Sequence, residues 1–451
     1  MRVVLYEPSG RGGICHYTHQ LAESLSRRGA DVTVVTTEDY ELSEVNRRFR
    51  LYLLFKRSLV TRLRQWAARR RRRMDTDIGA ASHRGPESKS AVHAFLRNTR
   101  LRFLHLRAAA RFLMRCPDVV HFQWFVGRRQ DLRFIRMLRW LRIPVIYTAH
   151  DVEPHLTASD RDREELQRIY DAVSRIVVHA ESNRRELLSL FPVEPGKVVV
   201  IPHGTYDLLC DPERLTPDPA RERLGVSTTK KVILFFGLIK RYKGLEYLVE
   251  AFEEVRRRVN DAFLLIVGDI YAADTASHAF YSGLIEKLHG RDDVLCVARY
   301  VPWDSVGDYL SASDVIVLPY ARTFQSGVLL AAYAAGRPVV VTDTGGLGEV
   351  VEQGKSGFVV PPRDPKALAE GIISVLSDKK LRTAMGERGR VLARTVYSWD
   401  SIAARTMELY ESALGTEADS LTNKQRKTGT SPATDGRTAN NREDEGRRVS
   451  L

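Results

Sequence analysis

The feature that most constrains the fold is a regular alternation of short apolar runs with helical patterns. In the first half, apolar runs occupy residues 2–8, 31–37, 118–124, 144–151 and 197–204, and residues 165–191 read as helix, strand and helix. Residues 10–30 have helical spacing at Tyr17, Leu21 and Leu25. Strands that alternate with helices indicate βαβ units and a parallel sheet.

A second series of the same kind follows the Pro- and charge-rich stretch DPERLTPDPARERLG. Its strands are expected in six runs: 231–239, 262–269, 294–301, 314–321, 337–343 and 357–362. Two consecutive α/β series predict two Rossmann-like lobes with parallel sheets that face each other across a cleft, an α/β architecture.

The expected domain boundaries follow from these series. Residues 1–205 form an N-terminal lobe with a basic insertion at about 41–115, and residues 206–395 form a C-terminal lobe. Residues 396–415 are expected to be a closing helix. Residues 416–451 contain almost no apolar side chains and are expected to be disordered.

The positive charge of the chain is concentrated in one segment. Residues 47–115 carry 20 Lys and Arg against three acidic residues, a net charge of +17, whereas the whole chain carries +14. The segment mixes Arg with Leu, Phe, Tyr and Trp, which is consistent with a solvated helical face beside a disordered loop, or with an amphipathic element on an anionic membrane surface. No nucleic-acid-binding motif accompanies the charge, so a nucleic-acid partner is not expected.

Other features predict a cytoplasmic protein, with peripheral attachment to the inner face of the cell membrane as a further interpretation. The sequence opens on the strand MRVVLYEP without a charged and apolar leader, and no run approaches the roughly 18–20 apolar residues of a membrane span. The four cysteines lie far apart without CxxC spacing, which favours a reducing compartment over disulfides or a zinc site.

Two segments are suited to binding an anion. In GRGGICHY, Gly12 and Gly13 begin a helix and let the backbone approach a ligand. In TFQSGVLLAAYAAGRPVVV, residues 323–341, Ser326 is a candidate N-cap, and the N–H groups of the next three residues are free to face a phosphate. Those three residues are Gly327, Val328 and Leu329.

Three cations follow the strand at 231–239, namely Lys240, Arg241 and Lys243. Side chains at the carboxyl end of a strand in such a sheet face the ligand crevice. Fixed cations there stabilise the negative charge that develops on a diphosphate leaving group, and they do so without a metal. The Asp-x-Asp triplets at 75–77 and 160–162 do not follow strand ends, so they are interpreted as surface residues, and no metal site is predicted.

Histidines also lie at strand ends. His150, in YTAHD, comes just past a strand, and an imidazole can donate or accept a hydrogen bond near neutral pH. His121 and His203 are weaker candidates of the same kind, and Asp151 or Glu153 could orient an acceptor hydroxyl.

Taken together, residues 1 to about 414 resemble a GT-B glycosyltransferase of the large retaining family 4. The resemblance is carried by the order and spacing of GGICHYTHQLAESLSRRGADVTVVT, VIYTAHD, VVVIPHG, FFGLIKRYKGLEYLVEAF, ARYVP, DVIVLPY and GGLGEVVEQGKSGFVVPPRDPKALAE. The resemblance implies that Lys243 is the family's lysine, with Lys240 or Arg241 in place of its arginine, and that His150 contacts the donor sugar. The family's two glutamates, eight residues apart, correspond to Thr323 and Ala331, so the chain resembles a subgroup that lacks them.

The sequence therefore predicts a retaining transferase that moves a sugar from a nucleoside-diphosphate donor, with no cofactor, to a glycan or lipid-linked acceptor of the cell envelope. The predicted catalytic residues are His150, Lys243 and Arg241. The predicted donor-binding residues are Gly12, Gly13, Gly237, Lys240, Arg299, Tyr300, Gln325, Ser326, Gly327, Val328 and Leu329, with Arg299 and Tyr300 beside the base and Gln325 and Ser326 beside the sugar.

Two alternatives remain open. The missing glutamates are also compatible with a catalytically silent nucleotide-sugar-binding scaffold at the membrane surface. A sugar-nucleotide epimerase could be built on the same two-lobed plan.

Overall fold

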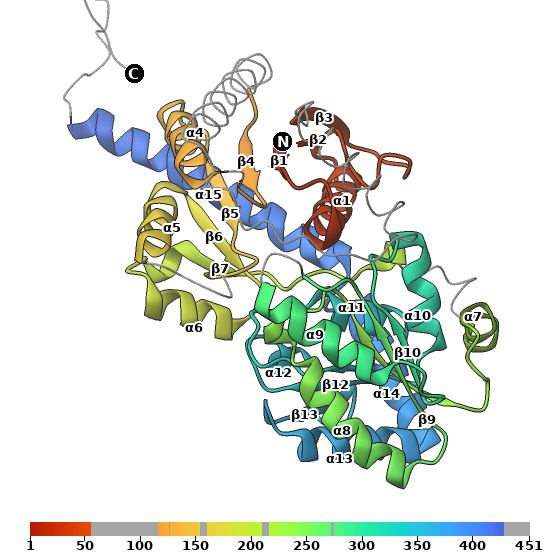
Figure 1. Cartoon of the computed structure of the whole chain (residues 1–451). Helices are drawn as coiled ribbons and strands as arrows, with labels where there is room; N and C mark the ends of the chain where they lie inside the picture. The colour runs from red at the N-terminus through yellow and green to blue at the C-terminus, as the bar shows by residue number, and fades with distance from the viewer. Residues whose placement is uncertain (56–115, 126, 154–159, 210–215, 272–274, 428–451) are drawn as a thin grey trace, which may run out of the picture.

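The computed structural model describes residues 1–55, 116–125, 127–153, 160–209, 216–271 and 275–427. It contains two parallel sheets, each covered by helices (Figure 1). The predicted α/β architecture of two Rossmann-like lobes is confirmed.

The first sheet has seven parallel strands in the order β3-β2-β1-β4-β5-β6-β7. Its strands are β1 (Arg2–Tyr6), β2 (Asp31–Thr37), β3 (Arg50–Phe55), β4 (Val119–Phe122), β5 (Val145–Thr148), β6 (Arg175–Val178) and β7 (Val198–Val200). Its helices are α1 (Gly12–Arg27), α4 (Arg128–Trp140), α5 (Asp160–Ala172) and α6 (Glu181–Leu190).

The second sheet has six parallel strands in the order β10-β9-β8-β11-β12-β13. Its strands are β8 (Lys231–Phe236), β9 (Ala262–Val267), β10 (Val294–Val297), β11 (Val315–Leu318), β12 (Val339–Thr342) and β13 (Gly357–Val360). The helices of this half are α7 (Pro217–Leu224), α8 (Leu245–Arg258), α9 (Thr275–Leu288), α10 (Val306–Ala312), α11 (Gly327–Ala334), α12 (Leu347–Val350), α13 (Pro365–Ser377) and α14 (Lys379–Arg394). Short 3₁₀ turns are η1 (Pro195–Lys197), η2 (Asp207–Leu209), η3 (Arg241–Lys243) and η4 (Trp303–Ser305).

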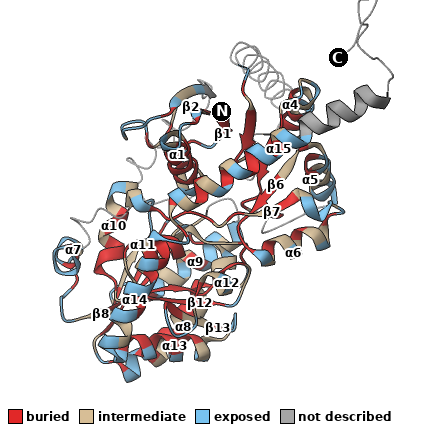
Figure 2. Cartoon of the chain, turned by 180° about the vertical axis from the view of Figure 1, so that it is seen from behind, coloured by how far each residue is buried: buried red, intermediate tan, exposed pale blue. Residues whose placement is uncertain are grey.

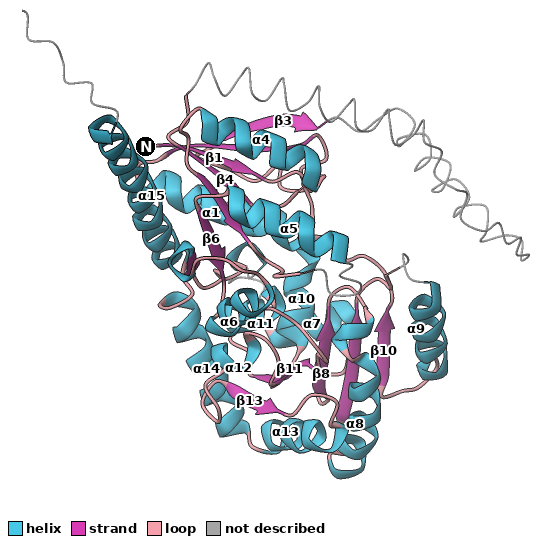
Figure 3. Cartoon of the chain, turned by 90° about the vertical axis from the view of Figure 1, so that its left-hand side faces the viewer, coloured by secondary structure: helices cyan, strands magenta, loops and turns pink. Residues whose placement is uncertain are grey.

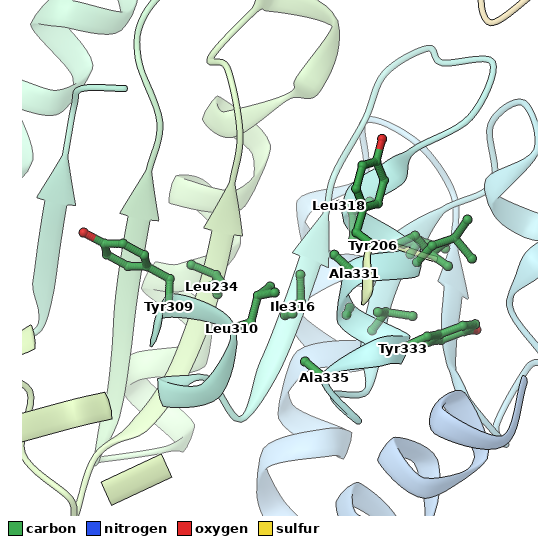
Figure 4. Packing of buried hydrophobic residues seen from close by; sticks show 14 of the residues in the cluster. Tyr206, Leu234, Tyr309, Leu310, Ile316, Leu318, Ala331, Tyr333 and Ala335 are labelled. Carbon is green, nitrogen blue, oxygen red and sulfur yellow. The ribbon is translucent and has the colours of Figure 1, made fainter. Parts of the chain in front are cut away.

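Both sheets are buried between helix layers, as the burial pattern in Figure 2 shows. The strands are continuous runs of apolar residues; β9, for example, is AFLLIV with every residue buried. A parallel strand needs this pattern because helices cover both of its faces. In the second lobe, one core joins β8 and β11 to α10 and α11 and includes Tyr206, from the segment that links the two sheets (Figure 4).

The strand orders place a topological switch point in each sheet. The chain leaves β1 toward β2 and returns on the other side as β4, and it repeats this pattern around β8 with β9 and β11. Ligands in open α/β sheets bind outside the carboxyl ends of strands at such points. The segments that follow β1, β8 and β11 are therefore the places to look for a site.

The last helix, α15 (Trp399–Lys427), runs from the second lobe back along the first (Figure 3). Trp399, Ile402 and Tyr410 share a buried cluster with Tyr17 and Leu21 of α1. The prediction that disorder begins at residue 416 is wrong for residues 416–427, because the helix continues to Lys427. Seven of the twelve residues in 416–427 are good helix formers, and the segment contains neither Gly nor Pro, so its composition does not end the helix.

The basic segment also contains a strand that the sequence interpretation missed. Residues 50–55, RLYLLF, form β3 at the edge of the first sheet, paired with β2. The prediction of an amphipathic membrane element within residues 47–115 otherwise lies outside the described residues.

A carboxylate of one lobe caps a helix of the other. Glu349 of α12 accepts hydrogen bonds from the backbone N–H groups of Glu181 (2.8 Å) and Ser182 (2.6 Å), at the start of α6. These N–H groups have no partner inside the helix, and the negative charge faces the positive end of the helix dipole.

We expect Glu349→Ala to lower the free energy of unfolding by about 1 kcal/mol, the typical loss when a helix cap is removed. The measurement is the urea midpoint of the variant against that of the unaltered protein. Glu349→Gln keeps an acceptor oxygen but loses the charge, so its midpoint should lie between the two. Equal midpoints for all three proteins would show that this contact does not stabilise the fold.

Candidate active site

A cavity of about 600 Å³ lies between the carboxyl ends of the two sheets and is lined by residues of both lobes. Twelve of the predicted site residues line it: Gly12, Gly13, His150, Gly237, Lys240, Lys243, Arg299, Tyr300, Gln325, Ser326, Gly327 and Val328. The structure therefore brings together residues that are more than 300 positions apart in the sequence.

One wall of the cavity carries two lysines. Lys240 directly precedes η3, and Lys243 is its last residue. A 3₁₀ turn places residues three apart on the same side. Their ammonium groups lie over the rings of Tyr271 (4.5 Å) and Tyr320 (5.2 Å), respectively. Within the described part of the chain neither lysine has a salt-bridge partner, and burial together with the neighbouring Lys243 lowers the pKa of Lys240. Asp151, also in the cavity lining, acts in the opposite direction, but two neighbouring ammonium groups without salt bridges among the described residues make this wall suited to an anion.

Gly237 makes the position of Lys243 possible. Its φ is +107°, and a Cβ on it would lie 2.8 Å from the Lys243 Nζ. The glycine at the end of β8 is therefore favoured by its left-handed backbone conformation, and a methyl group there would push the flexible end of Lys243 aside.

We expect Gly237→Ala to weaken donor binding at least tenfold, because the added methyl displaces the Lys243 ammonium and the left-handed backbone resists a side chain. Gly29→Ala is the matched control: Gly29 has φ +88° and nothing within 4 Å of a Cβ. Titration calorimetry with a nucleoside diphosphate should show weaker binding for the first variant only. A similar loss in both would mean that backbone strain, not the lysine, causes the effect.

Two predicted residues do not line the cavity. Arg241 is exposed, because the 3₁₀ turn directs the residue after Lys240 away from the cavity, so its assignment as a catalytic residue is not supported by its position. The Leu329 side chain is 1% exposed and belongs to the core of the second lobe, so only its backbone is available to a ligand.

The start of α11 forms the adjacent part of the cavity. Ser326 is the N-cap residue by position, but its side chain makes no capping hydrogen bond, and its Oγ lies 3.3 Å from the hydroxyl of Tyr320. The first backbone N–H groups of the helix, those of residues 327–329, are therefore not capped by Ser326, and such groups bind anions.

Gly327 was expected to let the backbone approach a ligand, but the structure shows a different need for a glycine there. A Cβ there would lie 2.2 Å from the Tyr206 ring, and a Cβ on Gly13 would lie 2.9 Å from the Tyr206 hydroxyl. The Tyr206 hydroxyl also donates a hydrogen bond to the Gly13 carbonyl oxygen (3.2 Å). Both glycines accommodate Tyr206, which joins the two lobes beside the cavity.

The positions that correspond to the family's glutamates carry no charge. Thr323 is 3% exposed and donates its hydroxyl to the Gln325 carbonyl oxygen (2.9 Å). Ala331 is 4% exposed and lines the cavity with its methyl group while packing in the core shown in Figure 4. Gln325 and Ser326 remain as neutral polar groups next to these positions.

The glycine-rich turn after β1 already has a partner. Gly12 has φ +73°, and its N–H donates to Glu41 Oε2 at 2.8 Å, so the free N–H expected there is occupied. Glu41 also accepts a hydrogen bond from the Tyr300 hydroxyl of the other lobe and lies 3.7 Å from His16 Nε2. Burial works against the charge of Glu41, but the nearby His16 imidazole and the hydrogen bonds from Tyr300 and Gly12 outweigh it and lower the pKa to about 2.

His150 lines the cavity and is almost fully buried. Burial, followed by the nearby His179 and His203, lowers its pKa well below the ordinary value, so the ring is neutral at pH 7. Of the weaker candidates, His203 lines the cavity, whereas His121 bonds Tyr410 and Thr148 (both 2.7 Å) within the first lobe. Asp151 lines the cavity, but Glu153 does not, because it is paired with Arg163 and Arg322.

The sequence interpretation missed several lining residues, and four of them are His16, Glu41, Tyr206 and Trp303. Glu41 carried a usable signal, since it follows the end of β2 at the same edge of the sheet as Gly12. The other three become visible only when the lobes are brought together. Among the residues that the structure describes, no three His, Cys, Asp or Glu side chains are placed to hold a metal ion.

Two parallel α/β lobes that face each other across a cavity, with lysines and a helix N-terminus on one wall, are the architecture of the GT-B class. The family models agree: "Glycosyltransferase Family 4" matches residues 11–206, and "Glycosyl transferases group 1" matches residues 218–392. The chain belongs to the group 1, or family 4, glycosyltransferases that these two models describe, and it is a glycosyltransferase.

Its relatives include two bacterial D-inositol 3-phosphate glycosyltransferases. The protein of Corynebacterium jeikeium is 30% identical over 312 residues, 65% of this chain and 72% of the relative. The protein of Kineococcus radiotolerans is 29% identical over 334 residues, 68% of this chain and 74% of the relative. Among solved structures, Anabaena Alr3699/HepE in complex with UDP-glucose superposes with a TM-score of 0.68 at 16% identity, covering 91% of this chain and all of that one.

Proposed function

We propose that the chain transfers a sugar from a nucleoside-diphosphate donor to an acceptor hydroxyl with retention of the anomeric configuration. The observation that carries the proposal is the pair of lysine ammonium groups, which form no salt bridge within the described residues, beside the start of α11, which Ser326 does not cap. This arrangement suits two adjacent phosphates better than a single carboxylate or a neutral ligand.

The lysine wall acts on the leaving group. As the bond between the anomeric carbon and the phosphate oxygen breaks, negative charge develops on the diphosphate, and Lys243 and Lys240 stabilise it. The N–H groups of residues 327–329 add the dipole of α11. The ammonium groups and backbone are fixed before reaction, so little reorganisation is needed when the charge appears.

The sugar and its acceptor occupy the other side of the cavity. We assign the donor-sugar contacts to His150, Gln325 and Ser326, which line the cavity where the usual glutamates are missing. The acceptor hydroxyl attacks from the face that the diphosphate leaves, through an ion-pair-like transition state and without a protein nucleophile. In such a reaction the departing phosphate itself can take the acceptor proton.

We propose the donor and the acceptor as chemical classes rather than as single compounds. The UDP-glucose complex of the Anabaena structure makes UDP-sugars the first donors to test. Residues 299–300 border the proposed base site. For the acceptor, the charge of residues 47–115 favours a lipid-linked or envelope glycan reached at an anionic membrane surface, and the names of the relatives make D-inositol 3-phosphate a second acceptor to test. No described helix is both long and apolar enough to cross a membrane.

A panel of UDP-, GDP-, ADP- and dTDP-sugars tests the proposal. We expect the sugar nucleotides that carry one particular base to raise the melting temperature of the protein. The same compounds should be hydrolysed slowly in the absence of an acceptor. Lys366→Ala, at an exposed position in the first turn of α13, should behave like the unaltered protein. If no member of the panel raises the melting temperature at millimolar concentration, the proposed donor class is wrong.

A further inference from the structure

Three histidines lie side by side at the carboxyl ends of three neighbouring strands. His150 follows β5, His179 follows β6 and His203 follows β7, and each is about 5% exposed. The Tyr17 ring of α1 packs against all three, with ring centroids 4.8, 5.4 and 4.8 Å away. His150 and His203 line the cavity, but His179 does not.

A backbone carbonyl fixes the proton of His179. Its Nδ1 lies 2.9 Å from the Ile201 carbonyl oxygen, which can only accept, so Nδ1 carries the hydrogen. Burial lowers the pKa of His179 to about 4, so the ring is neutral at pH 7 and its Nε2 carries a lone pair.

The position of the hydrogen on His179 determines the position of the hydrogen on His150. His179 Nε2 lies 3.2 Å from His150 Nδ1, and because the first is an acceptor, the second must be the donor. A neutral His150 with its hydrogen on Nδ1 has a lone pair on Nε2. The Ile201 carbonyl thus determines, through His179, which nitrogen of the cavity histidine is protonated.

Gln123, at the end of β4, completes the chain. Its Oε1 lies 3.2 Å from His150 Nε2, while its Nε2 is buried without a partner in the described structure. The two ends of a carboxamide have nearly the same shape, so hydrogen bonding decides its orientation. Rotated by 180°, the Gln123 amide donates to His150 Nε2, which agrees with the proton order set by His179.

We propose that His179 is a positioning residue that holds His150 in the neutral tautomer with the hydrogen on Nδ1. This inference rests on the proposed function: with Nδ1 bonded to His179 and Nε2 bonded to Gln123, the His150 ring meets the donor sugar in one fixed orientation and donates no N–H to it. His179 itself touches no substrate, so its effect passes entirely through the ring of His150.

The test combines ¹⁵N NMR of histidine-labelled full-length protein with kinetics using UDP-glucose. The His150 signals are identified as those missing from a His150→Phe spectrum. We expect them to show Nδ1–H in the unaltered protein and in His179→Gln, whose side-chain oxygen can accept from His150. In His179→Phe, which keeps a ring but no acceptor, the hydrogen should move to Nε2. The value of kcat should fall about 3- to 10-fold, the worth of one neutral hydrogen bond, with KM nearly unchanged.

Several outcomes would overturn the inference. These are an Nε2–H His150 in the unaltered protein, an unchanged tautomer in His179→Phe, or a changed tautomer with kcat unaltered. His289→Phe replaces an exposed histidine and controls for the substitution itself. If His179→Phe does not fold, the tautomer in the unaltered protein and in His179→Gln still decides. Absence of turnover by the unaltered protein with every sugar nucleotide of the panel would contradict the proposed function instead, since the tautomer is read without turnover.

Discussion

Replacing Lys243 by Ala should lower the rate of nucleoside-diphosphate release at least 100-fold. Removing one fixed group that stabilises developing negative charge typically costs a factor of about 10²–10³ in rate. Lys240 remains in this variant, and its ammonium group still contributes a second, separate positive charge. The loss should therefore be large but not complete.

The matched control lies in the same turn. Arg241→Ala removes a positive charge two residues from Lys243, but Arg241 is exposed and does not line the cavity. The rate of the Arg241→Ala variant should stay within about twofold of that of the unaltered protein. This result would exclude a general effect of net charge. Equal losses in the two variants, or a Lys243→Ala rate within tenfold of normal, would contradict the assigned role.

The second large effect is a loss of stability in mild acid. Burial, assisted in two cases by His179, lowers the pKa of His121 and His203 to about 3, and burial lowers that of His179 to about 4, from an ordinary 6.5. Such a histidine binds a proton more readily in the unfolded chain, so stability falls as the pH drops below about 6.5. Each contributes about 2 kcal/mol between pH 7 and pH 5, so the three together contribute on the order of 6 kcal/mol.

Urea unfolding at pH 7.5, 6.0 and 5.0 measures this effect. The free energy of unfolding should fall steeply from pH 7.5 to pH 5.0. His121→Asn should make this pH dependence shallower by the contribution of one proton. His289→Asn, at an exposed position, should leave the slope unchanged. A free energy that is flat between pH 7.5 and 5.0 would show that the buried histidines are not held neutral by the fold.

The architecture could be predicted because its signals are local. Each buried strand is a short apolar run, and each lobe repeats the same strand-helix alternation, so parallel sheets follow without knowledge of distant contacts. The strand β3 was missed because its residues lie among arginines that favoured a helical interpretation. The end of α15 was placed too early because composition favoured disorder over helix propensity.

The site could be predicted only in part, for a physical reason. The cations after β8 are visible in sequence, but only the 3₁₀ geometry of η3 shows that Lys240 and Lys243 face the cavity while Arg241 does not. Gly13 and Gly327 look like ligand-binding glycines, yet both accommodate Tyr206, from the segment between the lobes. Glu41 and Tyr300 meet across the lobes over 259 positions, so no local pattern could reveal their contact.

The most direct test of the central claim follows the donor by ³¹P and ¹H NMR as it reacts, using the sugar nucleotide that stabilises the protein. The account predicts release of the nucleoside diphosphate together with a sugar whose newly formed anomeric centre has the configuration of the donor, and Lys243→Ala should slow both. A donor that binds but stays intact would identify a silent binding scaffold. A new sugar nucleotide without diphosphate release would identify an epimerase, and an inverted anomeric centre would exclude retention.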